Sequence, residues 1–127
     1  MSGASGWISL RWSKKCVVRN QVSHTMEVAR YRALACVPPN TLAELTPARG
    51  TIALQCSAPG CARCATFEVE ERAEFEKASL DGVDYIVPWN CADHHRRQLA
   101  MDAGVRAIPA YVLLSASSEP RVLTPKT

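Results

Sequence analysis

The chain has 127 residues, of which 47% are hydrophobic and 21% are charged, and it carries a formal net charge of +3. This amount of apolar material suffices for one hydrophobic core, so we expect one globular domain without room for a second catalytic domain. The longest apolar runs are far shorter than the roughly 20 residues that a membrane helix needs, and the N-terminus lacks the apolar stretch of a secretory signal, which argues against membrane insertion and classical export.

The positive charge is concentrated in residues 1–50, which hold seven basic and two acidic side chains. No acidic residue precedes Glu27, and this basic, serine-containing composition is typical of an organelle transit peptide or of a solvated arm. We expect a cytoplasmic protein, with organelle targeting through the basic N-terminus as the alternative. Basic and aromatic residues do not alternate on one recognisable face, so no nucleic-acid partner is expected.

The first predicted helix spans residues 23–36, where apolar side chains recur at nearly helical spacing and Ser23 can cap the N-terminus. Val37-Pro38-Pro39-Asn40 ends this helix. Residues 1–20 form a basic arm to which no structure is assigned.

Strands and helices are predicted to alternate after residue 50. Residues 51–56 read as a short buried strand between Gly50 and Ala58-Pro59-Gly60. A long helix follows over residues 62–80, with its apolar side formed by Cys64, Phe67, Phe75 and Ala78. The other side of this helix carries charged residues, which predict a solvated face: Glu68, Glu70, Glu71, Arg72, Glu74, Glu76 and Lys77.

The second half continues the alternation. Residues 83–89 predict a strand, and Asp93 is the expected N-cap of a helix that runs to Ala103 and ends at Gly104. Residues 111–114 predict a buried strand and residues 121–123 a short edge strand. This order indicates an α/β fold with a central mixed sheet flanked by helices, in which the first two strands are parallel.

Six cysteines without an export signal argue against a static disulfide framework. Cys36 and Cys56 are expected to be core thiols and Cys91 a core or accessory thiol, while Cys16 stays unassigned. Cys61-Ala62-Arg63-Cys64 differs, because it lies where a strand is followed by a helix. The free N–H groups of a first helical turn stabilise a thiolate, and two thiols three positions apart can form a reversible disulfide.

Two motifs together resemble the thioredoxin superfamily: Ser57-Ala58-Pro59-Gly60-Cys61-Ala62-Arg63-Cys64 and, about forty residues later, Gly104-Val105-Arg106-Ala107-Ile108-Pro109-Ala110-Tyr111. The Ala-Pro-x-Cys-x-x-Cys form is most similar to domains of the protein disulfide isomerase type. The resemblance implies a thioredoxin-like fold over residues 21–127, with its core over 50–124. It also implies that Cys61 is the exposed nucleophile and Cys64 the resolving cysteine. Pro109 would follow a cis bond, and the Ile108 backbone would face the sulfurs and pair with an extended substrate.

The function that this resemblance implies is thiol-disulfide exchange without a cofactor. Cys61 would attack a partner disulfide, and Cys64 would release the product from the mixed disulfide. The expected partners are proteins with disulfides or dithiols and a thiol reductant or reductase. The direction of electron flow stays open.

Three positions modify this expectation. Gly60 stands where the family usually has an aromatic residue, and this removes a flat apolar platform for the substrate. Gln55 stands where thioredoxin-type domains often bury an acid, and an amide cannot accept the proton of Cys64. Arg63 either stabilises a thiolate at Cys61, which favours the reduced form, or points to solvent.

The closing C-terminal helix of the family is expected to be absent, because the sequence stops soon after Leu123. One face of the sheet would then need cover from residues 21–36 or from a second copy in a homo-oligomer.

Two other functions remain open at this stage. One is a redox-inactive thioredoxin-like binding module, which the residues at positions 55 and 60 favour. The other is a zinc site formed by Cys61, Cys64, Cys91 and His94, although the 26 residues between the two pairs exceed the usual zinc-ribbon spacing.

Overall fold

The computed structural model describes residues 39–125, so the predicted helix over 23–36, the basic arm, Cys16 and Cys36 lie outside the described residues. The alternation of strands and helices predicted after residue 50 is confirmed. In chain order the elements are a 3₁₀ turn η1 (Leu42–Glu44), β1 (Thr51–Ser57), α3 (Ala62–Thr66), a π-helical turn η2 (Phe67–Glu71), α4 (Arg72–Ser79), β2 (Tyr85–Asn90), α5 (His94–Ala103), β3 (Ala110–Ser115) and β4 (Ser118–Leu123).

The strands form one mixed sheet in the order β2-β1-β3-β4. β1 and β2 are parallel, as predicted, with Ile52 paired with Tyr85. β3 is antiparallel to both of its neighbours, β1 and β4. This arrangement, together with the helices on either side, is a thioredoxin-like fold.

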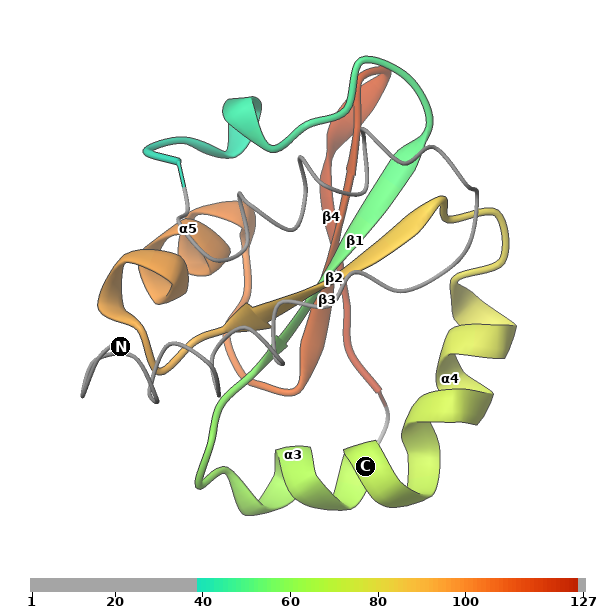
Figure 1. Cartoon of the computed structure of the whole chain (residues 1–127), viewed down its shortest axis with the longest axis vertical. Coiled ribbons are helices and arrows are strands. Elements are labelled where there is room, and N and C mark those ends of the chain that lie inside the picture. Colours follow the sequence, from blue (N-terminus) through green and yellow to red (C-terminus); the bar gives the residue numbers. More distant parts are fainter. Residues whose placement is uncertain (1–38, 126–127) are drawn as a thin grey trace, which may run out of the picture.

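Helices cover both faces of the sheet (Figure 1). α5 lies on one side, and the segment from α3 through α4 lies on the other. Successive residues of the central strand β1 contribute to opposite faces, since Ile52, Leu54 and Cys56 belong to the core under α5, whereas Ala53 packs with Phe67 on the other face. A strand buried on both faces explains the nearly continuous apolar run that the sequence shows at 52–56.

The predicted ends of α5 are confirmed. The Asp93 carboxylate accepts a hydrogen bond from the Arg96 backbone N–H at 2.9 Å, and Gly104 adopts the left-handed conformation (φ 114°) that follows many helices. Trp89 on β2 donates its indole N–H to the Arg96 carbonyl oxygen at 2.9 Å and is buried. Trp89 therefore fixes α5 against the sheet.

The edge strand β4 is longer than predicted and contains Pro120. Proline is tolerated there because an edge strand has N–H groups that need no partner in the sheet. No helix follows β4 within residues 39–125, and no helix of that part of the chain is long and apolar enough to cross a membrane.

Candidate active site

Cys61 and Cys64 form a disulfide at the start of α3, with their Cα atoms 5.2 Å apart. Three residues, 58–60, separate Cys61 from the end of β1. This is the strand-to-helix junction that the sequence predicts for the pair. Cys64 is buried, whereas Cys61 is partly exposed, so the first sulfur is the more accessible of the two.

Cys61 is also the N-cap residue of α3. Its sulfur accepts a hydrogen bond from the Cys64 backbone N–H, with 3.1 Å between nitrogen and sulfur. The same N–H stabilises negative charge on the Cys61 sulfur when the disulfide is reduced. The local backbone therefore favours a thiolate at Cys61.

Gly60 has a backbone requirement that the resemblance to the thioredoxin superfamily does not indicate. Its φ is 82°, a left-handed conformation that side chains with a Cβ rarely adopt, although nothing lies within 4 Å of the place where a Cβ would be. The glycine is thus explained by the turn into Cys61 rather than by crowding at its Cβ position.

The peptide bond between Ile108 and Pro109 is cis, as the resemblance implies. Pro109 is buried directly before β3, and Ala110, the first residue of β3, is paired with Cys56 near the end of β1. Because β1 and β3 are antiparallel, the turn before Cys61 and the loop with Pro109 leave the sheet at the same edge. The fold thus brings the two sequence motifs together at one end of the sheet.

Comparison with known proteins adds no assignment. No protein-family model matches the sequence, and no curated protein matches it. The fold and the disulfide between Cys61 and Cys64 are compatible with redox chemistry.

The sequence predicts one regular helix over residues 62–80, but the structure shows an interrupted one. The π-helical turn η2 interrupts it between α3 and α4. Phe67 points into the core, where its ring meets the rings of Phe75 and Tyr111 edge-on, and those two rings stack on each other. Val69 in the same turn is 83% exposed. The prediction that Ala78 faces the core is wrong, because Ala78 is exposed after the shift in helical phase that the π-turn introduces.

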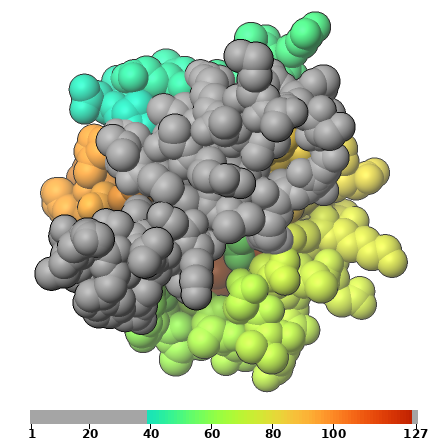
Figure 2. Space-filling model, viewed as in Figure 1, coloured from blue at the N-terminus to red at the C-terminus, as the bar shows by residue number. Residues whose placement is uncertain are grey.

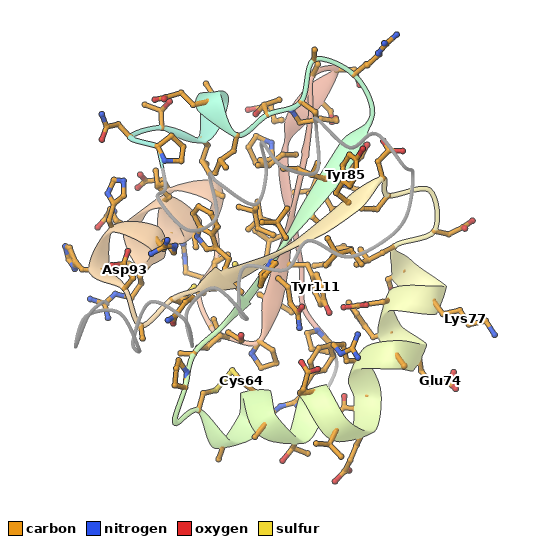
Figure 3. The ribbon with its side chains drawn as sticks, in the orientation of Figure 1. Cys64, Glu74, Lys77, Tyr85, Asp93 and Tyr111 are labelled. Atoms are coloured by element: carbon orange, nitrogen blue, oxygen red, sulfur yellow. A yellow bond between two sulfur atoms is a disulfide. The ribbon has the colours of Figure 1, made fainter. Side chains whose placement is uncertain are left out.

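The acidic side of this helix is only in part a solvated face. Glu74 and Lys77 point away from the sheet (Figure 3), and the exposed side chains of this segment form the lower right of the space-filling view (Figure 2). Glu76, in contrast, is only 11% exposed and accepts a hydrogen bond from the Tyr111 hydroxyl on β3. Some of the acidic residues therefore connect the helix to the sheet.

Arg72 links two of these acids, with its Nε 2.7 Å from Glu68 and its Nη1 3.2 Å from Glu76. Glu68 also accepts a hydrogen bond from the side-chain amide of Gln55 on β1 at 3.3 Å. The sequence did contain one signal for this network: a polar residue in a buried strand needs a hydrogen-bonding partner. It did not identify Glu68 as that partner.

Arg63 is paired with Glu71 through a salt bridge of 3.2 Å. Its side chain therefore does not extend freely into solvent, which was one of the two sequence-based alternatives. Since about a third of each side chain is exposed, water weakens this interaction, and we assign it little stabilising energy.

Cys56 and Cys91 form a second pair of cysteines, and both are free thiols buried on the α5 side of the sheet. The Cys91 backbone N–H donates to the Ser57 carbonyl oxygen at 2.8 Å, which brings Cys91 beside the end of β1. A hydrogen bond from the Cys56 thiol lowers the pKa of Cys91, and Arg97 lowers it further, although burial acts in the opposite direction. The same hydrogen bond, together with burial, raises the pKa of Cys56.

The zinc alternative finds no support in this geometry. Among residues 39–125, no three His, Cys, Asp or Glu side chains lie together as metal ligands would. Cys61 and Cys64 are bonded to each other, and Cys91 is hydrogen-bonded to Cys56. The two halves of the proposed ligand set are thus engaged separately.

The shared hydrogen bond predicts how Cys91 titrates. Cys56→Ala removes the donor that stabilises the Cys91 thiolate, so the pKa of Cys91 is expected to rise, and Arg97→Gln is expected to cause a smaller rise. Both can be measured from the ultraviolet absorbance of thiolates against pH in oxidised protein, where Cys61 and Cys64 do not titrate. Cys91→Ala identifies the relevant step by removing it. An unchanged step in Cys56→Ala would contradict the assigned hydrogen bond.

Proposed function

We propose that this protein is a thiol-disulfide oxidoreductase of the thioredoxin superfamily, most similar to domains of the protein disulfide isomerase type. The observation that carries the proposal is the disulfide between Cys61 and Cys64 at the start of a helix, at the same edge of the sheet as the cis bond before Pro109. A disulfide that serves only stability has no need of a partly exposed sulfur or of an N–H directed at it.

The chemistry follows from the difference between the two cysteines. In the reduced form, the Cys61 thiolate attacks one sulfur of a partner disulfide, and the other partner sulfur leaves as a thiolate that takes up a proton. Cys64 then attacks Cys61, and the second partner sulfur leaves. Two electrons pass to the partner, which is released as a dithiol, and the protein is left with its own disulfide. The reverse sequence oxidises a partner dithiol.

In this proposal, the partner is a protein segment in an extended conformation. The open space around Gly60 leaves room for it beside the disulfide, and the loop with Ile108 and Pro109 supplies the backbone groups that would pair with it. A thiol reductant or a reductase would restore the dithiol. Gly60, Ile108 and Pro109 are therefore the proposed substrate-binding residues.

The proposal is tested by the reduction of insulin disulfides with dithiothreitol as the electron donor. The native chain is expected to accelerate the reaction, and Cys61→Ser is expected to show only the uncatalysed rate. Val69→Ser, a substitution at an exposed position of the same helical segment, is the matched control and should keep the native rate. Equal rates for the native chain and Cys61→Ser would instead favour a redox-inactive binding module.

A further inference from the structure

The second pair of cysteines, Cys56 and Cys91, lies at the end of the sheet that leads to the disulfide. β1 and β2 are parallel and end together, since Ser57 is paired with Asn90. Cys56 directly precedes Ser57, and Cys91 directly follows Asn90. The Cys91 backbone N–H donates to the Ser57 carbonyl oxygen at 2.8 Å, which extends the pairing of the strands by one residue. The ladder thus brings both cysteines to the carboxyl ends of β1 and β2.

The two thiols are in contact. Both are free and belong to the core under α5, and the Cys56 thiol donates a hydrogen bond to the Cys91 sulfur. The sulfurs of a disulfide are about 2.05 Å apart, so two thiols at hydrogen-bond distance have only to move closer to form one. Packing alone does not require two sulfurs in contact, because a free cysteine packs as a small apolar side chain.

The two cysteines differ in access and in charge. Cys56 is 0% exposed, whereas Cys91, at the start of the turn after β2, is 6% exposed. The hydrogen bond from Cys56 lowers the pKa of Cys91, and the positive charge of Arg97 lowers it further, although burial acts in the opposite direction. Since the thiolate is the reactive form, Cys91 is the thiol that reacts first. A sulfur so little exposed is accessible to hydrogen peroxide but not to a protein or a bulky disulfide.

We propose that Cys56 and Cys91 form a second redox site, a dithiol that hydrogen peroxide oxidises to a disulfide. The Cys91 thiolate attacks one peroxide oxygen, the bond between the two oxygens breaks, and the hydroxide that leaves takes up a proton to give water. Cys91 is then a sulfenic acid. The Cys56 sulfur bonds to the Cys91 sulfur, and the departing hydroxide combines with the Cys56 proton to give a second water.

The two thiols together give up two electrons to one peroxide molecule. A dithiol reductant restores both thiols by exchange with the new disulfide. This chemistry does not depend on the proposed exchange at Cys61 and Cys64, because neither of these residues takes part in it.

The cross-link can be located by tryptic peptide mapping of the full chain with Cys61→Ser and Cys64→Ser combined. Trypsin then places Cys56 in the peptide 50–63 and Cys91 in the peptide 78–96. After exposure to hydrogen peroxide, these two peptides should be found as one disulfide-linked species, which dithiothreitol separates. In the native chain the peptide 78–96 should become linked to the species that already contains the disulfide between Cys61 and Cys64. The second measurement does not require the double variant to fold.

Single substitutions assign the roles of the two thiols. In Cys56→Ala the sulfenic acid at Cys91 has no thiol with which to condense. With dimedone present during the oxidation, labelling of Cys91 should therefore rise at least about tenfold over the native chain. Cys91→Ala is the matched control, in which Cys56 should stay unlabelled because its side chain is fully buried.

Two free thiols after peroxide treatment would overturn the proposal, and so would oxidation of Cys91 to a sulfinic acid without a cross-link. Labelling of Cys56 in Cys91→Ala that equals the labelling of Cys91 in Cys56→Ala would overturn the assignment of Cys91 as the attacking thiol. None of these results changes the rate of insulin reduction, which tests the proposed function separately.

Discussion

Cys64→Ser is expected to trap the protein as a stable mixed disulfide with its partner. The variant keeps Cys61, its hydrogen bond from the backbone N–H at position 64, and the turn at Gly60, so the first attack proceeds. The sulfur that would release the partner from within is gone, and release then depends on external thiols. Because an intramolecular attack corresponds to a very high effective concentration, we expect the lifetime of the adduct to increase by at least about a hundredfold.

The trapped species can be measured by mass spectrometry or by non-reducing gel electrophoresis after incubation with a disulfide-containing protein. Cys61→Ser is the matched control, since the only sulfur of the pair that it keeps is that of Cys64, which is buried. It should form little or no adduct. Equal trapping by the two variants would contradict the assignment of Cys61 as the nucleophile and Cys64 as the resolving cysteine.

Phe67→Ala is expected to lower the free energy of unfolding by about 3–5 kcal/mol. Phe67 is 1% exposed, and its ring contacts Phe75 at 5.7 Å and Tyr111 at 6.1 Å between centroids. Truncation to alanine removes these contacts and leaves a cavity between the helix that follows Cys64 and the sheet. The loss can be measured by urea denaturation.

Val69→Ala provides the comparison from the same π-helical turn. Since Val69 is 83% exposed, its truncation should change the free energy of unfolding by no more than about 0.5 kcal/mol. Similar losses in the two variants would show that Phe67 does not anchor this segment to the sheet.

The cis bond before Pro109 was predicted from the family resemblance, whereas the parts of the site that were predicted from residue patterns alone are those whose residues are close together along the chain. Cys61 and Cys64 are three positions apart, and their place after an apolar strand indicated a helix start. The caps of α5 were found in the same way, because Asp93 caps the first turn of this helix and Gly104 directly follows its last turn.

The parts that were missed depend on how distant segments meet. Glu68 looks like one of several acids on a charged helix until the π-turn and the register of β1 bring it to Gln55. The hydrogen bond between Cys56 and Cys91 likewise depends on the register of β1 against β2, which no local pattern specifies. Ala78 was misplaced because regular helical spacing was extended across a turn of a different pitch.

The position of β1 in the sheet has a consequence for motion during turnover. β1 is hydrogen-bonded to β2 on one side and to β3 on the other, so exposing its amides to solvent requires two ladders to separate. Segments of this kind belong to the last part of a protein to open by local unfolding, and their amide hydrogens exchange slowly. The exposed turn at Gly60 can thus admit and release partners while the strand that leads into it stays closed.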